Sequence, residues 1–294
     1  MRLHRFALFS LAAAALVALS PWAHELSAQP RASNIVRSGQ ALLDEIRNHR
    51  DGTAVWWLGH DSWLIKADGV VLGTDLVAEE PQRMEPPPLT AAQLATVVDV
   101  SFVTHGHKDH FHRLTERTLA EQGHAEFVVP RSTVAIARDE LHLPENRLHI
   151  AVPREPFDIK GIHVQPIRAL HGNGRFAVYE QASMDDCGYV WTIGGKTFLE
   201  PGDSVLLEDQ LFVKHVNVLF FSPTEHNTWI EPSVVLINEL EPDYILPQHR
   251  DTYTVTPEKR FWTQGYAREV ALLLSKAMRE RYRILEIGER ILIR

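Results

Sequence analysis

The chain has 294 residues, of which 45% are hydrophobic and 23% charged, a composition typical of a globular protein with a sizeable core. The net charge is −8 and the basic residues form no stripe along the sequence, so a nucleic acid is not an expected partner. Cys187 is the single cysteine, which excludes an internal disulfide and a cysteine-based zinc site.

Residues 1–28 have the layout of an export signal. A short basic start is followed by an apolar run over residues 6–19, which is too short for a comfortable membrane span. Cleavage is expected after Ala23 or Ala28, and the alternative is an uncleaved helix that tethers the chain to a membrane. We therefore predict a periplasmic or secreted protein whose mature part has no membrane-spanning domain.

The remaining chain is expected to form an N-terminal helical arm over residues 29–53 and one main domain over residues 54–294. In the first half we predict a helix at 35–47, a bent strand at 54–66 broken at Gly59, a strand at 70–72, a proline-rich loop at 81–88, a short helix at 91–94, a strand at 97–103, a helix at 111–122, a strand at 126–130 and a helix at 132–141 capped by Ser132.

The second half begins with strands rather than helices. We predict strands at 147–150, 157–159 and 162–167, a long loop at 172–186, a hairpin of 188–193 with 196–199, strands at 216–221 and 244–246, a final helix from Pro257 with Trp262, Tyr266, Val270, Leu273 and Ala277 inward, and a terminal hairpin of 284–287 with 290–293. The chain thus divides into two halves, each with strands followed by helices.

A cluster of metal-binding residue types lies at the end of the predicted strand 97–103. Its residues are His105, His107, Asp109 and His110. Imidazole nitrogen and carboxylate oxygen are ligands of zinc and related divalent metals. His105 and His107 are two positions apart and can face the same way, whereas Asp109 and His110 follow where the chain bends. Four donors so close together would crowd one metal, so the cluster indicates two metals side by side.

Three further candidate ligands each close a predicted strand: His171, Asp203 and His249. The ends of strands are favoured places for sites on an α/β scaffold, and a carboxylate such as Asp203 can bridge two cations. Taken one by one, Asp203 could equally be a turn-capping residue and His249 a loop histidine, but the set as a whole favours a metal site.

These residues, with Gly202 and Ser204 around Asp203, resemble the metal-ligand set of the metallo-β-lactamase-fold hydrolases across residues 54–250. The segment Gly59-His60-Asp61-Ser62 is similar to the branch that contains L-ascorbate-6-phosphate lactonases and N-acyl phosphatidylethanolamine phospholipase D-type enzymes. The resemblance implies an α/β fold, namely an αββα sandwich of two mixed β-sheets flanked by helices.

The resemblance also implies a role for each ligand. His105, His107 and His171 would hold one ion, Asp109, His110 and His249 the second, and Asp203 would bridge them. Two such cations lower the pKa of a shared water, giving hydroxide near neutral pH, and stabilise charge on a carbonyl or phosphoryl oxygen. Asp109 could also hold the proton of this hydroxide.

Several other residues are candidates for supporting roles. Asp75 is expected behind the cluster, where it would accept the second N–H of a metal-bound histidine, or else to be a strand-end turn residue. His226 could protonate a leaving group or contact substrate, or else be a solvated loop histidine. His60 is expected to be buried and hydrogen-bonded rather than to line the site, and Trp229 and Tyr179 either shape a pocket or pack.

The sequence therefore predicts a hydrolase with two divalent ions, zinc first and manganese or iron as alternatives, acting on an ester, lactone, amide or phosphodiester. The expected substrate is a small or lipid-like molecule. Two alternatives stay open: an iron-containing oxidoreductase or dioxygenase with the same ligands, and a non-catalytic metal-binding module.

Overall fold

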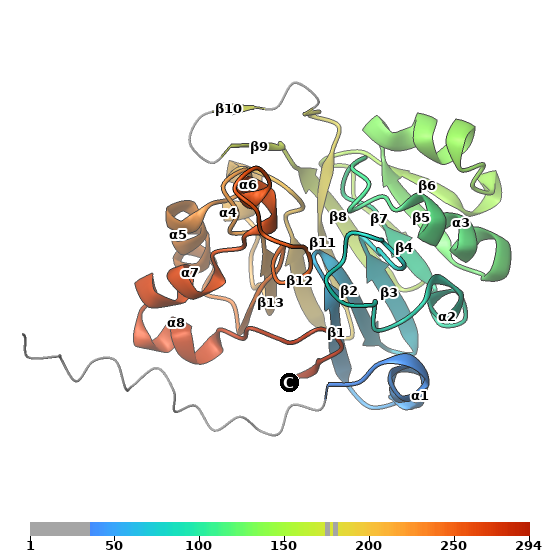
Figure 1. The fold of residues 1–294 in the computed structure, drawn as a ribbon, viewed down its shortest axis with the longest axis horizontal. Coiled ribbons are helices and arrows are strands. Elements are labelled where there is room, and N and C mark those ends of the chain that lie inside the picture. Colours follow the sequence, from blue (N-terminus) through green and yellow to red (C-terminus); the bar gives the residue numbers. More distant parts are fainter. Residues whose placement is uncertain (1–35, 174–176, 179–181) are drawn as a thin grey trace, which may run out of the picture. The chain divides into compact units, whose positions relative to one another are not determined.

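The computed structural model describes residues 36–173, 177–178 and 182–294, and only this part of the chain is considered below (Figure 1). The predicted export signal at 1–28 and the first residues of the predicted arm lie outside the described residues. Within the described residues, each helix is too short or too polar to cross a bilayer.

The first sheet has seven strands, in the order β15-β1-β2-β3-β4-β5-β6. Its strands are β1 (Thr53–Gly59), β2 (Ser62–Ala67), β3 (Val70–Thr74), β4 (Val100–Phe102), β5 (Glu126–Pro130), β6 (Leu148–Ala151) and β15 (Arg290–Ile293). The pairs from β15 to β3 are antiparallel and those from β3 to β6 are parallel, so the sheet is mixed. The last strand of the chain therefore lies beside the first.

The second sheet has six strands, in the order β14-β13-β12-β11-β8-β7. They are β7 (Phe157–Ile159), β8 (Ile162–Arg168), β11 (Cys187–Ile193), β12 (Lys196–Glu200), β13 (Val218–Phe221) and β14 (Tyr244–Pro247). This sheet is also mixed, because β12, β13 and β14 are parallel whereas β7, β8, β11 and β12 pair antiparallel. A short ribbon of β9 (Gly172–Asn173) and β10 (Ala177–Val178) extends from it.

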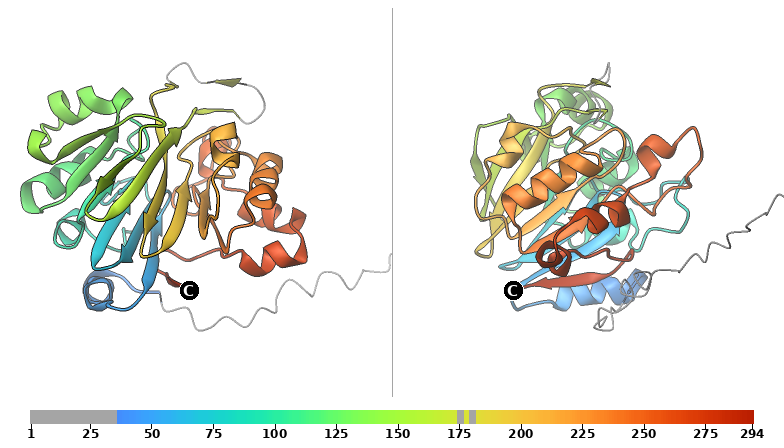
Figure 2. Two further views of the ribbon diagram at one scale, coloured as in Figure 1. Left: turned by 180° about the vertical axis from the view of Figure 1, so that it is seen from behind. Right: turned by 90° about the vertical axis from the view of Figure 1, so that its left-hand side faces the viewer.

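Helices cover the outer faces of the two sheets (Figures 1 and 2). Those on the first sheet are α1 (Gly39–Asn48), α2 (Ala91–Ala95) and α3 (Arg113–Gln122), and those on the second are α4 (Glu208–Leu211), α5 (Ile230–Leu240), α7 (Ala267–Leu273) and α8 (Lys276–Arg281). The short α6 (Arg260–Thr263) lies near β9, at the end of the second sheet from which the β9–β10 pair extends.

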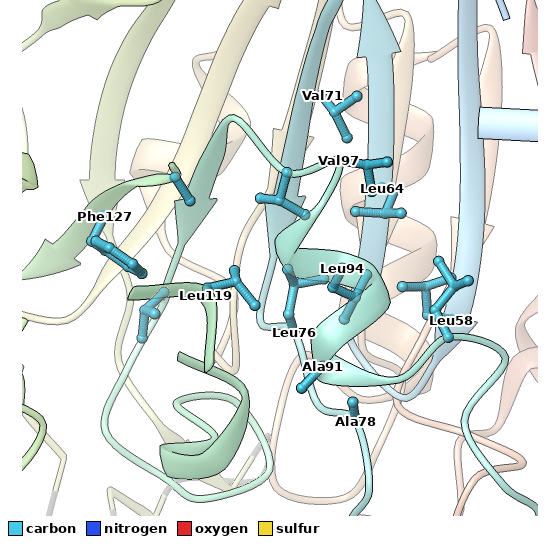
Figure 3. Packing of buried hydrophobic residues seen from close by; sticks show 14 of the residues in the cluster. Leu58, Leu64, Val71, Leu76, Ala78, Ala91, Leu94, Val97, Leu119 and Phe127 are labelled. Atoms are coloured by element: carbon cyan, nitrogen blue, oxygen red, sulfur yellow. The ribbon is translucent and has the colours of Figure 1, made fainter. Parts of the chain in front are cut away.

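Three apolar clusters hold these layers together. One packs α1 to α3 on the first sheet through residues such as Leu94, Leu119 and Phe127 (Figure 3). A second fills the space between the sheets with Trp57, Trp191 and their neighbours, and a third lies under the helices of the second sheet. Burial of these side chains supplies the main driving force for folding. The predicted αββα sandwich is thus confirmed.

Most predicted elements are present within a few residues of their expected bounds, but the segment 132–141 differs. It forms a 3₁₀ turn at Arg131–Thr133 and one π-helical turn at Ile136–Glu140 instead of a regular helix. Ser132 is not its N-cap, because its hydroxyl donates to Asp186 across the chain. The expected cap was wrong because a distant carboxylate competes for the serine.

The C-terminal predictions were wrong in two places. The final helix is broken into α6, α7 and α8, so Leu273 is 58% exposed instead of facing inward. The break includes Gly265, where a Cβ would lie 2.7 Å from Arg250 Cβ and 2.8 Å from the carbonyl oxygen of His249, so the chain approaches too closely for another residue. Residues 284–287 form no strand, and β15 pairs with β1 instead. Helix α5 was not predicted.

Candidate metal centre

The candidate ligands come together at the ends of strands from both sheets. His105 to His110 follow β4, His171 follows β8, Asp203 follows β12 and His249 follows β14. The strands β4, β12 and β14 end in buried residues, which fix the positions at which the site segments begin. Segments far apart in the sequence therefore deliver their side chains to one place.

Backbone conformation at this edge is unusual. His60, Asp75 and His249 have φ values of 52°, 44° and 56°, in the left-handed region that costs a non-glycine residue about 1 kcal/mol or more. Gly202 also has a positive φ of 66°, and a Cβ there would lie 3.0 Å from Thr104 Cβ. Such conformations cluster at functional sites, where the surrounding fold stabilises them.

His105, His107 and His171 form the first group of donors. The Nε2 atom of His105 lies 3.0 Å from Nδ1 of His107, and the ring centroid of His171 is 4.7 Å from that of His107. One donor atom from each residue lies within 4.8 Å of the other two. Three imidazoles at this spacing match the ligand count of a zinc site that keeps a position open.

Asp203 occupies the centre of the cluster. Its Oδ2 atom is 3.2 Å from Nε2 of His171 and 3.4 Å from Nε2 of His110. The same oxygen is 3.1 Å from Nε2 of His249. Asp203 is therefore placed between the first group and the histidines of the second, where a bridging ligand would stand.

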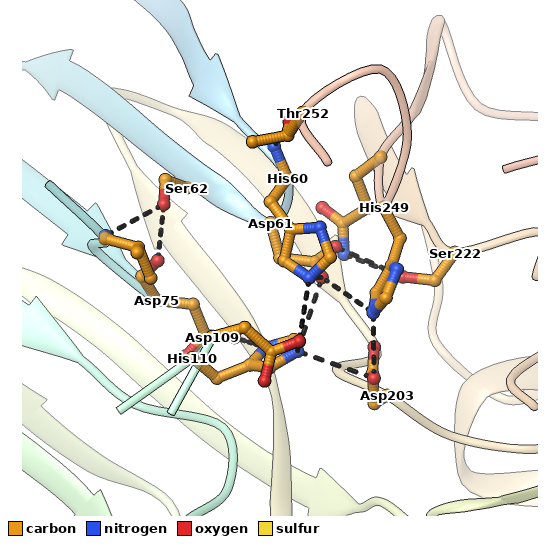
Figure 4. A network of polar contacts seen from close by, with 12 residues as sticks. His60, Asp61, Ser62, Asp75, Asp109, His110, Asp203, Ser222, His249 and Thr252 are labelled. Atoms are coloured by element: carbon orange, nitrogen blue, oxygen red, sulfur yellow. Dashed lines mark hydrogen bonds and ion pairs between the residues drawn. The ribbon is translucent and has the colours of Figure 1, made fainter. Parts of the chain in front are cut away.

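The second group contains His110 and His249, joined by two residues of the β1–β2 turn. One donor atom each of His60, Asp61, His110 and His249 lie within 4.8 Å of one another (Figure 4). Asp109 stands further out, with Oδ2 4.0 Å from Nε2 of His110 and 3.1 Å from Nε2 of His60. It belongs to none of the donor groups found among the described residues.

Asp75 supports the cluster from behind. Its Oδ2 atom lies 2.8 Å from Nδ1 of His110 and accepts a hydrogen bond of 2.6 Å from the Thr104 hydroxyl, while Oδ1 accepts from the Thr104 amide at 2.8 Å. The same hydroxyl lies 3.0 Å from Nδ1 of His105. Asp75 thus contacts one histidine of the second group directly and one of the first group through Thr104.

His226 is not a solvated loop histidine, because it is only 4% exposed. Its Nδ1 lies 3.0 Å from the carbonyl oxygen of Phe261, and its Nε2 lies 3.3 Å from Oδ2 of Asp203. Trp229 packs edge-on against Tyr266, with centroids 4.9 Å apart, and does not line the cavity beside the site. Tyr179 lies outside the described residues.

The protonation states suit metal binding in the first group. Burial lowers the pKa of His107 to about 4 and the pKa of His105 well below its usual value, so both imidazoles are neutral at pH 7. Neutral imidazole is the form that ligates a metal. For His110, burial is outweighed by the carboxylates of Asp203 and Asp75, which raise its pKa well above normal.

The charges of the cluster also fit a divalent cation. Among the described residues, the ion pairs of Asp61, Asp109 and Asp203 are all with histidines, not with lysine or arginine. Asp61 Oδ2, Asp203 Oδ1 and His110 Nε2 are buried there without a hydrogen-bond partner. Such atoms cost free energy unless something satisfies them, and a coordinated cation would do so.

A cavity of ≈ 520 Å³ opens beside the cluster. His107, His171 and His226 reach it from the cluster side, and the aromatic residues Tyr253, Phe261 and Trp262 line it together with Lys108, Asp109, Glu80 and Gln82. A concave cavity with an aromatic wall and convergent polar groups is typical of a small-molecule site.

The fold and the site together define an αββα protein with a histidine- and aspartate-rich centre at one edge of its sheets. A family model described as a β-lactamase superfamily domain matches residues 54–249. The chain therefore belongs to the β-lactamase superfamily, and the superfamily predicted from the histidine cluster is confirmed.

Individual relatives agree with this family. An uncharacterised protein of Mycobacterium tuberculosis is 31% identical over 132 residues, which cover 42% of this chain and 35% of that protein. The chain thus matches about a third of the length of its mycobacterial relatives. A UPF0173 metal-dependent hydrolase of Pelotomaculum thermopropionicum is 28% identical over 206 residues, covering 68% of this chain and 85% of that protein.

Solved structures show the same fold. A metallo hydrolase of the archaeon Ignicoccus hospitalis superposes with a TM-score of 0.63 at 18% identity, covering 81% of this chain and 97% of the other. A diiron β-hydroxylase of Streptomyces venezuelae superposes with a TM-score of 0.60 at 15% identity, covering 84% of this chain and 55% of the other. At these identities the superpositions show a shared fold.

Sequence reasoning missed one member of the cluster, Asp61, and placed another, His60, outside the ligand set. The available signal was the segment Gly59-His60-Asp61-Ser62 at the end of an apolar strand, which was used only for the family resemblance. The structure does show His60 buried and hydrogen-bonded, as predicted, with Asp109 as its partner.

Proposed function

We propose that the protein is a metal-dependent hydrolase that uses two divalent ions, zinc in the first instance, to cleave an ester, lactone, amide or phosphodiester bond. The observation that carries the proposal is the position of Asp203 between two groups of histidines. Its Oδ2 lies within 3.4 Å of Nε2 atoms from both groups, namely His171 on one side and His110 on the other.

The chain supplies the ligands in two sets. His105, His107 and His171 would hold the first ion, His110, Asp109 and His249 the second, and Asp203 would bridge. Ions bound there would lower the pKa of a water and polarise the substrate's carbonyl or phosphoryl oxygen.

Two residues at the cavity are assigned to proton transfer. Asp109 lines the cavity, with its Oδ2 3.1 Å from Nε2 of His60, and we assign to it the proton lost by the attacking water. His226 also lines the cavity, and the Phe261 carbonyl 3.0 Å from Nδ1 directs the other ring nitrogen toward the cluster. We assign to His226 protonation of the leaving group.

The cavity favours a small or lipid-like substrate with an apolar portion. Tyr253, Phe261 and Trp262 offer an aromatic wall for that portion, and the donors of the centre face the other side. Lys108 is a cation at the rim that would pair with an anionic group near the scissile bond. This chemistry is consistent with lactones, phosphodiesters and N-acyl phospholipids.

The test is a hydrolysis screen on protein stripped of metal and then reloaded with Zn²⁺, Mn²⁺ or Fe²⁺. Lactones, phosphodiesters and N-acyl phospholipids form the panel, with His107→Ala as the inactive variant. His163→Ala is the matched control, because His163 is a solvent-exposed histidine on β8. We expect activity in the wild type and the control but not in His107→Ala. A wild type as inactive as His107→Ala would favour the metal-binding module.

The fold of the diiron β-hydroxylase supports a second candidate, an iron-containing oxidoreductase or dioxygenase with the same ligands. Oxygen consumption by the iron-loaded protein, without hydrolysis of any substrate in the panel, would favour this candidate over the hydrolase. Hydrolysis by the zinc-loaded protein under nitrogen would exclude it.

A further inference from the structure

Asp61 is a buried carboxylate to which the proposed ligand set gives no role. It lies in the turn between β1 and β2 and is 1% exposed. The hydroxyl of Ser222 donates to Oδ1 at 3.2 Å, which fixes the orientation of the carboxylate. Among the described residues, the other oxygen, Oδ2, has no hydrogen-bond partner. An unpaired oxygen of this kind is costly in a buried place and requires an explanation.

The unpaired oxygen faces the second group of histidines (Figure 4). It lies 3.5 Å from Nε2 of His110 and 3.6 Å from Nε2 of His249. Ligands of a tetrahedral ion with bonds of about 2.1 Å are about 3.4 Å apart, so these distances are those between ligands of one metal. The distance is too long for a hydrogen bond to either nitrogen.

The nitrogens that face Asp61 also face Asp203. Asp75 contacts the opposite nitrogen of His110, Nδ1, at 2.8 Å, so Nδ1 keeps its proton and Nε2 is the nitrogen that would bind a metal on losing its own. Nε2 of His249 lies 3.1 Å from Oδ2 of Asp203, which is the proposed bridging atom. Donor atoms of Asp61, His110 and His249 therefore lie within 4.8 Å of one another, and Asp203 Oδ2 is 3.4 and 3.1 Å from Nε2 of His110 and His249.

We propose that Asp61 is a ligand of the second ion, and that this makes the two metal positions chemically different. The inference rests on the proposed dinuclear site. The first position has three imidazoles and one carboxylate, a set suited to tetrahedral zinc. The second has the imidazoles of His110 and His249 with the carboxylates of Asp61 and Asp203, while His60, the third histidine of its group, has its Nε2 3.1 Å from Oδ2 of Asp109. A set richer in carboxylate oxygen binds manganese or iron(II) better than three imidazoles do, so manganese added to protein that already holds one zinc enters the second position.

The experiment compares the wild type with Asp61→Asn, which keeps the shape and the Ser222 hydrogen bond but removes the anionic ligand. Asp99→Asn is the matched control, because Asp99 is a partly buried carboxylate that accepts the Val71 amide far from the cluster. Metal-free protein is loaded with one equivalent of Zn²⁺ per chain and then titrated with Mn²⁺, and bound metal is measured by mass spectrometry and by the electron paramagnetic resonance of Mn²⁺.

We expect the wild type and Asp99→Asn to bind one zinc and one manganese per chain. Asp61→Asn should keep its zinc and bind manganese more weakly by at least about 10-fold, the lower bound for loss of an outer partner of a ligand. The mixed loading of the wild type is a test that does not depend on the folding of the variant.

The outcomes separate the two proposals. Two ions bound by Asp61→Asn with unchanged affinity and selectivity would overturn the role of Asp61 but leave the dinuclear site standing. Failure of the zinc-loaded wild type to bind manganese, or displacement of its zinc by manganese, would overturn the difference between the positions. A wild type that binds neither metal would overturn the dinuclear site and the Asp61 proposal together.

Discussion

Replacement of Asp75 by Asn tests how the fold prepares its histidines for metal. The substitution keeps the size of the side chain, and Asn tolerates the left-handed backbone found at this position, where φ is 44°. The Asn carbonyl oxygen can still accept the Thr104 amide in place of Oδ1. Its NH₂ group then replaces Oδ2, so a hydrogen-bond donor faces Thr104 and His110 in place of a hydrogen-bond acceptor.

The new donor reverses the hydrogen bonds behind both metal positions. Facing Nδ1 of His110, at the 2.8 Å contact now made by Oδ2, it forces the ring proton onto Nε2, which then cannot ligate. The Thr104 hydroxyl, which now donates to Oδ2, would instead accept from the Asn and donate to Nδ1 of His105. Both histidines therefore lose the tautomer that presents Nε2 to a metal.

The loss of such partners lowers metal affinity by about 10- to 100-fold, or about 1.4–2.7 kcal/mol per ion. Calorimetric titration of the metal-free protein with Zn²⁺ measures both binding steps. We expect Asp75→Asn to weaken both, whereas Thr104→Val, which removes only the hydroxyl beside His105, should weaken only one. Unchanged affinity for both ions in Asp75→Asn would refute the reasoning. It would also be refuted if Asp75→Asn and Thr104→Val each weakened the binding of only one ion, and by the same factor.

The other predictions concern stability, metal removal and proton transfer. Burial raises the pKa of Glu116 to about 8, above its unfolded value, so its contribution to stability is lost as the pH rises toward 8. In urea unfolding, the free energy of unfolding of Glu116→Gln should rise relative to that of the wild type by about 1.4 kcal/mol per pH unit between pH 5 and 7. Equal pH dependence of the two unfolding free energies would contradict this. Removal of metal by a chelator should lower the melting temperature by about 5 °C or more in calorimetry, because bound ions stabilise the folded state, and no shift would contradict a buried metal site. His226→Gln should lower kcat by about 100-fold with metal content unchanged. Loss of a metal from that variant would instead make His226 a ligand.

The sequence predicted those candidate ligands that directly follow an apolar strand. His105, His107 and His110 follow β4 within one short segment, so their proximity is a consequence of covalent geometry. His171 and Asp203 follow β8 and β12, and their meeting with the cluster depends on how two sheets face each other. The family resemblance supplied that arrangement.

The sequence places Asp61 just after an apolar strand but does not show that it reaches the histidines, because that depends on the conformation of a turn. The left-handed backbone of His60, with φ of 52°, directs the β1–β2 turn, and no periodicity in the sequence encodes this conformation. The C-terminal helix was mispredicted for a similar reason. Its apolar spacing is regular, but Gly265 lies against the backbone of His249, and this tertiary contact overrides the local pattern.

The most direct measurement is anomalous X-ray diffraction from crystals grown with Zn²⁺ and Mn²⁺, at wavelengths that distinguish the two metals. The account predicts two anomalous peaks per chain, one among His105, His107 and His171 and the other among His110, His249 and Asp61, with Asp203 between them. A single peak, or peaks away from these side chains, would contradict it.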